Sequence, residues 1–85
     1  MKTYIITYDL NKEGQNYQWL INKIQEYKYI HPMKSVFFIK SNSTSTEINN
    51  ILLDYIDTND RLFISEVTSN RNWLLTQDDW NFISN

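Results

Sequence analysis

The first segment of the chain, residues 2–9, alternates between two kinds of side chain. One side carries Tyr4, Ile6 and Tyr8, and the other carries Thr3, Ile5, Thr7 and Asp9. A period of two in a segment rich in β-branched and aromatic residues is typical of a β-strand. The polar run 11–14, which ends in the single glycine of the chain, then predicts a turn.

A helical spacing of apolar residues begins at residue 16. The positions that share one face are Tyr17, Leu20, Ile21, Ile24 and Tyr27 or Lys28. Steps of three and four residues predict an amphipathic helix. We expect it to end near Tyr29, because Pro32 follows closely and disfavours helical backbone before it. The segment 29–31 is also compatible with a short strand, followed by a turn at Pro32 and Met33.

A continuous apolar run, Val36–Ile39, marks the centre of the next predicted strand, residues 34–40. Such a run indicates a strand that is buried on both faces. Helices on one side of a sheet cannot cover its other side. We therefore expect a partner to contribute cover here, and we place Phe37 and Ile39 among the interface residues.

Residues 44–56 carry the clearest helical pattern in the chain. Thr44 and Glu47 have the spacing of a capping box, in which each side chain bonds to the other residue's backbone amide. The apolar positions that follow are Ile48, Ile51, Leu52, Tyr55 and Ile56. Residues 57–60 predict a turn by composition. Residues 61–67 predict a strand, whose two faces carry Leu62 and Ile64 on one side and Phe63 and Val67 on the other.

The tail is less regular. Residues 73–75 predict either an edge strand or an arm. Thr76, with Asp79 three residues later, can cap a short helix. Its apolar residues are Trp80, Phe82 and Ile83.

The order of these elements predicts an α+β fold. It is the βαββαβ order of a ferredoxin-like sandwich, with one sheet and two helices on one of its faces. We expect residues 1–85 to form a single domain, in which residues 68–85 are a C-terminal arm with a short helix.

Composition limits how such a chain is stabilised. A chain of 85 residues buries roughly 60–65% of its unfolded surface, so its core is thin. It contains no cysteine, which closes the disulfide and zinc–thiolate routes and leaves oligomerisation. No run of about 18 apolar residues is present, so we expect no membrane span. The chain opens on a strand pattern without signal-peptide character, and we expect a cytoplasmic protein.

Charge and aromatic content favour a protein partner. The net charge is −2 and the pI is about 5.1, and the lysines and arginines are scattered singly. Strong nucleic-acid binding normally rests on clustered basic residues, so this balance disfavours a nucleic-acid partner. Aromatic residues make up 15% of the chain, enough to supply an interface. We expect Trp19, Trp73 and Trp80 to serve protein–protein contact, although core packing is the alternative for at least one of them.

Specific segments resemble a known family. Residues 3–10, Thr-Tyr-Ile-Ile-Thr-Tyr-Asp-Leu, resemble the opening strand of the small CRISPR-associated adaptation proteins, which ends in a Tyr-Asp pair. Segments 35–40, 57–64 and 72–73 resemble the branch of that family called SinR-like. The resemblance covers residues 2–75 and implies a ferredoxin-like fold. It also implies a homodimer in which C-terminal strands or arms exchange across the interface and the two Asp9 residues approach each other.

The resemblance nominates Asp9 as a catalytic residue and metal ligand. Two carboxylates, one per subunit, would bind Mg²⁺ or Mn²⁺, which would polarise a phosphate and activate water. The alternative is structural: Asp9 ends the strand, caps a turn at residues 11–12 or pairs with a lysine. Thr7 lies on the same predicted strand face and would orient a ligand or simply favour the strand.

Other polar residues carry weaker signals. His31, the single histidine, has no identifiable local partner, and we expect a solvated turn residue. Ser35 lacks the sequence context of a nucleophile. Asp54, Asp57 and Asp60 do not have the spacing of a calcium loop and suit a helix end and turn. The pair 78–79 suits a helix N-terminus, where negative charge is favourable.

These observations predict a non-catalytic homodimeric module that binds another protein and requires no cofactor. The resemblance adds the setting, prokaryotic or phage defence or counter-defence. The alternative is a weak endonuclease, dependent on Mg²⁺ or Mn²⁺, that cleaves RNA or DNA through Asp9 of each subunit.

Overall fold

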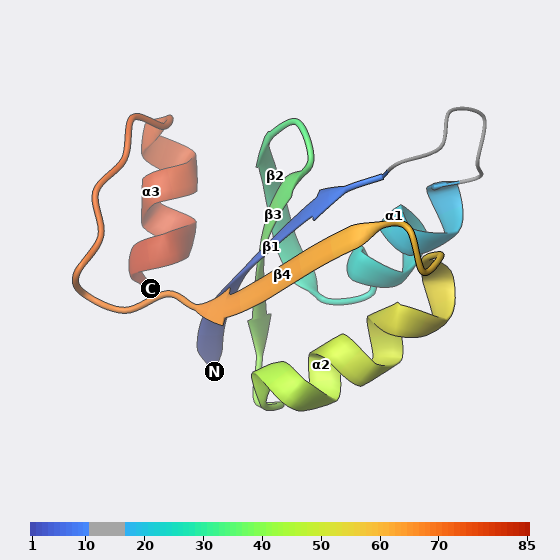
Figure 1. Ribbon diagram of the computed structural model, residues 1–85. Coiled ribbons are helices and arrows are strands. Elements are labelled where there is room, and N and C mark those ends of the chain that lie inside the picture. The colour runs from blue at the N-terminus through green and yellow to red at the C-terminus, as the bar shows by residue number, and fades with distance from the viewer. Residues whose placement is uncertain (11–16) are drawn as a thin grey trace.

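Four strands form one antiparallel sheet in the order β2-β3-β1-β4 in the computed structural model (Figure 1), which describes residues 1–10 and 17–85. The strands are β1 (Lys2–Asp9), β2 (Lys28–Met33), β3 (Val36–Ser41) and β4 (Arg61–Glu66). The helices in the described part of the chain are α1 (Gln18–Ile24), α2 (Ser45–Leu52), the single-turn η1 (Leu53–Tyr55) and α3 (Gln77–Ser84). The predicted α+β, ferredoxin-like order is confirmed.

The alternation in β1 places the core on one face of the sheet. Tyr4 and Ile6 are buried, and they pack with residues from β3, α1 and α2. This cluster consists of Tyr4, Ile6, Leu20, Ile24, Phe37, Ile39, Ile48 and Leu52. Leu62 and Ile64 of β4 pack against its margin, as the period of two in that strand predicts.

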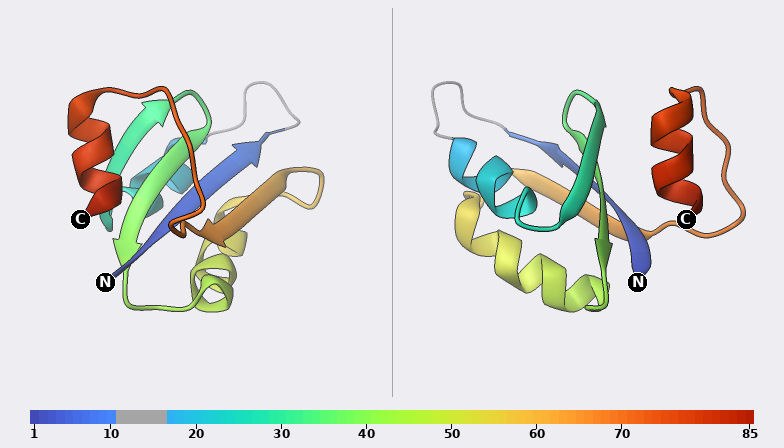
Figure 2. Two further views of the ribbon diagram at one scale, coloured as in Figure 1. Left: turned by 90° about the vertical axis from the view of Figure 1, so that its left-hand side faces the viewer. Right: turned by 180° about the vertical axis from the view of Figure 1, so that it is seen from behind.

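Helices lie on both faces of the sheet, but on the second face they cover only part of it. Figure 2 shows α1 and α2 on one side and α3 on the other, over β2 and β3. Phe38 of β3 is buried on the side of α3, and Ile83 is the buried residue of α3. The prediction that β3 is buried on both faces is confirmed. We expected a partner to cover the second face of β3. This expectation is corrected, because α3 of the same chain lies over that face.

The first helix is shorter than its sequence pattern predicts. It ends at Ile24 rather than near Tyr29, and residues 28–33 form β2 instead. Residues 28–33 form a strand rather than a longer helix because their backbone groups pair with those of β3, with Tyr29 opposite Ile39. Pro32 is tolerated since β2 is an edge strand and its register is irregular between Ile30 and Met33.

The turn before β3 lies two residues later than predicted. Lys34 and Ser35 connect β2 to β3, and Ser35 has a positive φ of 63°. The expected turn at Pro32 and Met33 is therefore wrong. The predicted polar turn at residues 11–14 lies outside the described residues.

The predicted caps are confirmed at two helices. Thr44 Oγ1 accepts from the Glu47 amide at 3.1 Å, while Glu47 Oε1 accepts from the Thr44 amide at 2.8 Å. The Asp79 amide donates to Thr76 Oγ1 at 3.2 Å at the start of α3. Residues 73–75 lie in the irregular connection to α3 and form no strand. Across the described ranges, every helix is too short or too polar to span a lipid bilayer.

Candidate functional site

The C-terminal half of β1 and the adjoining β4 lie beside α3 rather than beneath it (Figure 2). Asp9 pairs in register with Arg61, Thr7 with Phe63, and Ile5 with Ser65. We call the surface formed by Ile5, Thr7, Asp9, Phe63 and Ser65 the open face. β4 is also the last strand of the sheet order, so its outer edge has no strand partner among the described residues.

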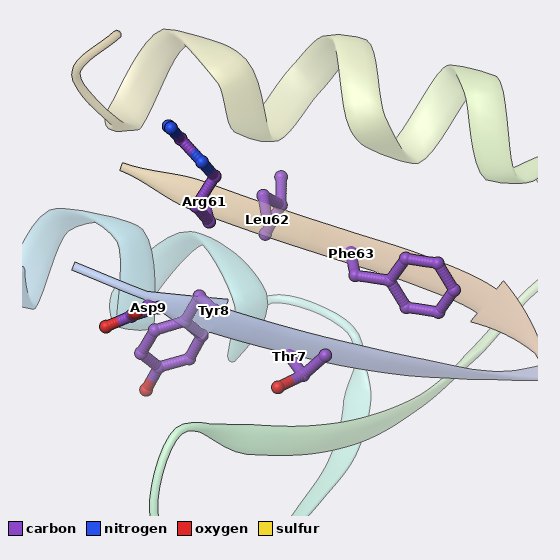
Figure 3. A pocket seen from close by; sticks show the side chains of 6 residues that line it. All are labelled: Thr7, Tyr8, Asp9, Arg61, Leu62 and Phe63. Carbon is purple, nitrogen blue, oxygen red and sulfur yellow. The ribbon is translucent and has the colours of Figure 1, made fainter. Parts of the chain in front are cut away.

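A shallow hollow lies at one end of the open face. Its lining residues, drawn in Figure 3, are Thr7, Tyr8, Asp9, Arg61, Leu62 and Phe63. The Arg61 side chain points away from Asp9, and its Nη1 donates to the Asp60 carbonyl oxygen at 3.1 Å. The two residues are therefore neighbours in the strand register without forming an ion pair.

Successive side chains of a strand point to opposite faces of the sheet, so Tyr8 and Asp9 lie on different faces. Tyr8 turns toward α1 and α2, and its ring stacks on Phe37 with centroids 6.3 Å apart. Burial raises the pKa of the Tyr8 hydroxyl, so this side chain stays neutral. Asp9 is exposed, and within the described residues its carboxylate has no hydrogen bond or ion pair. The pair therefore anchors the strand with Tyr8 and presents an exposed carboxylate with Asp9.

Asp9 alone is a sparse metal site. Mg²⁺ takes six oxygen ligands in an octahedron, of which one carboxylate supplies one or two. Over residues 1–10 and 17–85, no three His, Cys, Asp or Glu side chains gather as a metal site would require. A metal at Asp9 would take its other ligands from water, a phosphate or a second chain.

Phe63 is the most conspicuous side chain of the open face. It is 60% exposed although it lies in the middle of a strand. Its neighbour across the strand pair is Thr7, and the next pair along β1 is Ile5 with Ser65, both half-buried. An exposed aromatic ring on an uncovered sheet face is typical of a contact surface.

The predicted interface residues fall in three places. Phe37 and Ile39 are fully buried in the chain's own core, so neither has surface left for a partner, and their assignment is corrected. Trp19 is 65% exposed on α1. Trp73 and Trp80 contact each other, with ring centroids 6.0 Å apart, in the connection to α3 and in α3 itself. The tryptophans thus lie on both sides of the sheet rather than on one surface.

The remaining polar candidates take structural positions. The His31 ring stacks on Phe37, with centroids 3.9 Å apart and planes 14° apart, a contact that the sequence did not predict. The Asp57 amide donates to Asp60 Oδ2 at 2.9 Å, which confirms the predicted turn. Asp54 lies in η1, and Asp78 and Asp79 lie in the first turn of α3.

One pair of basic residues was not predicted from the sequence to lie together. Lys28 and Lys40, treated there as isolated basic residues, lie directly opposite each other on β2 and β3. Lys40 is 8% exposed, and its Nζ donates to Thr3 Oγ1 at 2.5 Å. The pairing of residues 28–33 with β3 was the missing signal, since it alone brings the two lysines together.

Comparisons with known proteins identify a family. A family model described as CRISPR associated protein Cas2 matches residues 1–73, a range that includes all four strands and ends ahead of α3. No curated protein and no solved structure matches the chain with significance.

Proposed function

Because the chain belongs to the CRISPR-associated protein Cas2 family, we propose that it acts in a CRISPR-associated setting as a non-catalytic homodimeric module that binds another protein. The observation that carries this proposal is the 60% exposed Phe63 at the centre of the open face. The family assignment accords with the resemblance seen in the opening strand. We also propose that the chain belongs to the SinR-like branch of the family and that it acts in defence or counter-defence.

The proposed dimer brings the open faces of two copies together. A two-fold axis would set the same surface of each copy against the other, so each Phe63 ring is buried once per subunit. Burying a phenylalanine side chain contributes about 2 kcal/mol. The two Asp9 residues would then lie at the same interface. The connection from β4 to α3 leaves the sheet at the end of the open face (Figure 2), so we include the arm of residues 68–85, with Trp73 and Trp80, in the contact.

Trp19 suits a different role. It lies on α1, in the helical layer on the far side of the sheet from the open face. A face-to-face dimer would leave it accessible. Large exposed aromatic residues are frequent anchors in protein–protein interfaces. We therefore assign Trp19 to contact with the second protein.

Sedimentation equilibrium on the purified chain tests the dimer. Phe63→Arg should weaken self-association at least about 100-fold. Both subunits of a symmetric dimer carry the substitution, so two buried phenylalanine rings are lost and two like charges are placed at the contact. Leu53→Arg is the matched control, since Leu53 is 48% exposed in η1 on the helical layer. It should leave self-association unchanged. A wild-type chain that stays monomeric at micromolar concentration would contradict the proposal.

The alternative function is a weak metal-dependent endonuclease acting on RNA or DNA. The exposed Asp9 carboxylate on the open face favours it, because a face-to-face dimer would supply two carboxylates to one Mg²⁺ or Mn²⁺. No cofactor is needed under the main proposal, whereas this alternative requires the metal.

Asp9→Asn separates the two functions. The endonuclease requires that cleavage of RNA or DNA depends on added Mg²⁺ or Mn²⁺ and falls at least about 100-fold in Asp9→Asn. The main proposal predicts no metal-dependent cleavage by either protein. Circular dichroism should show the same fold in both proteins, since Asp9 is exposed at a strand end. Cleavage that survives in Asp9→Asn would exclude Asp9 as the catalytic residue.

A further inference from the structure

The sheet face beneath α3 carries basic side chains that have no acidic partners among the described residues. Lys28 and Lys40 lie there, and Arg71 approaches from the connection to α3. The one ion pair among the described residues, Lys23 with Glu26, is elsewhere, on α1 and the turn that follows it. Among the described residues, no carboxylate oxygen lies within 4 Å of the side-chain nitrogens of Lys28, Lys40 or Arg71.

Lys40 is the most constrained member of this group. Its side chain is nearly buried between β1 and α3, with its Nζ bonded to Thr3 Oγ1 and 5.2 Å from the centre of the Phe82 ring. Burial lowers the pKa of its ammonium group, and the positive charges of Lys28 and Arg71 lower it further. A buried cation is stabilised by a nearby anion, whereas the two charges that act on Lys40, those of Lys28 and Arg71, have the same sign as its own.

Lys28 faces Lys40 across the strand pair. Like charges directly opposite each other on one sheet face are destabilising. Lys28 is exposed, so its ammonium group can move toward a ligand at low cost. An anion placed between the two ammonium groups would convert the repulsion into two favourable contacts.

A hollow is present where such an anion would bind. It has a volume of about 310 Å³ and opens between the sheet and the C-terminal end of α3. Its lining residues are Met1, Lys28, Lys40, Asn81, Phe82 and Asn85. The lining thus combines two ammonium groups with two side-chain amides, which are hydrogen-bond donors suited to a tetrahedral oxyanion.

We propose that this hollow binds a phosphate group between the ammonium groups of Lys28 and Lys40. The side-chain amides of Asn81 and Asn85 supply further donors. The site lies under α3, separate from Asp9 and the open face, and it does not depend on the proposed dimer. The phosphate group can come from free orthophosphate or from the phosphorylated end of a nucleic acid.

Thermal unfolding of the full chain tests the site. Sodium orthophosphate is titrated at constant ionic strength, with sodium chloride as the reference salt. Binding to the folded chain should raise the melting temperature along a saturable curve. Lys28→Gln should weaken the apparent phosphate affinity about tenfold, since one charge-assisted contact is lost. Lys34→Gln, an exposed lysine in the β2–β3 turn at the opposite end of these strands, should change it less than about twofold.

Two results would overturn the proposal. One is an effect of phosphate that matches chloride at every concentration. The other is an equal loss of affinity in Lys28→Gln and Lys34→Gln, which would indicate general charge screening. A 5′-phosphorylated oligonucleotide and its unphosphorylated counterpart distinguish the sources. If only the phosphorylated oligonucleotide competes with orthophosphate, the ligand is the phosphorylated end of a nucleic acid. If neither oligonucleotide competes, the ligand is free orthophosphate.

Discussion

Ser35 occupies the second position of the two-residue turn between β2 and β3 with a φ of 63°. A side chain with a Cβ atom is strained in this left-handed region, whereas glycine is not. We predict that Ser35→Gly raises the free energy of unfolding by roughly 0.5 kcal/mol. Urea unfolding followed by tryptophan fluorescence measures the change.

Lys34→Gly is the control for that prediction, because Lys34 precedes Ser35 in the same turn and has no positive φ. There glycine adds freedom to the unfolded chain without relieving strain, so stability should fall by roughly 0.5–1 kcal/mol. If both glycine variants lower stability alike, strain at Ser35 is not significant.

Individual residues were predictable where their partners are close in sequence. The bonds between Thr44 and Glu47 follow from a spacing of three residues. The contact of His31 with Phe37, and the opposition of Lys28 and Lys40, depend on strand register. Asp9 was located correctly at the end of a strand. Its lack of a partner among the described residues depends on the direction taken by the Arg61 side chain, which no sequence pattern reveals.

At the scale of elements, α2 begins at the capping box of Thr44 and Glu47. We predict that Thr44→Ala lowers the free energy of unfolding by about 1 kcal/mol, because an orphaned amide loses its acceptor. Thr46→Ala is the matched control in the first turn of the same helix, where Thr46 is exposed. It should change stability by less than about 0.5 kcal/mol. Chemical denaturation of both variants measures the difference, and equal losses would rule out a specific cap.

Element boundaries were predictable for α2 and β4, but not where local and non-local preferences compete. The segment that follows α1 has an apolar spacing that extends the helix toward Tyr29. Pairing with β3 satisfies its backbone groups instead, and β2 begins at Lys28. The short helix α3 was predicted from its cap and apolar residues. Its position over β3 was not, since the sequence does not indicate which surface Ile83 covers.

For the whole molecule, the order of elements was sufficient to predict the ferredoxin-like sheet. The matched family region, residues 1–73, ends before α3. This helix is therefore the part of the described chain that the family match does not explain. It covers β2 and β3 and leaves the open face available beside it, so the position of α3 restricts the surface on which two copies can meet.

A distance measurement between two subunits tests the proposed face-to-face dimer most directly. The chain contains no cysteine, so one introduced cysteine places a single nitroxide label on each subunit. Glu66→Cys labels the end of β4 beside the open face, and Leu53→Cys labels the helical layer. Pulsed dipolar spectroscopy should give a shorter distance between labels at position 66 than between labels at position 53. A shorter distance at position 53, or no coupling between subunits at either position, would contradict the dimer.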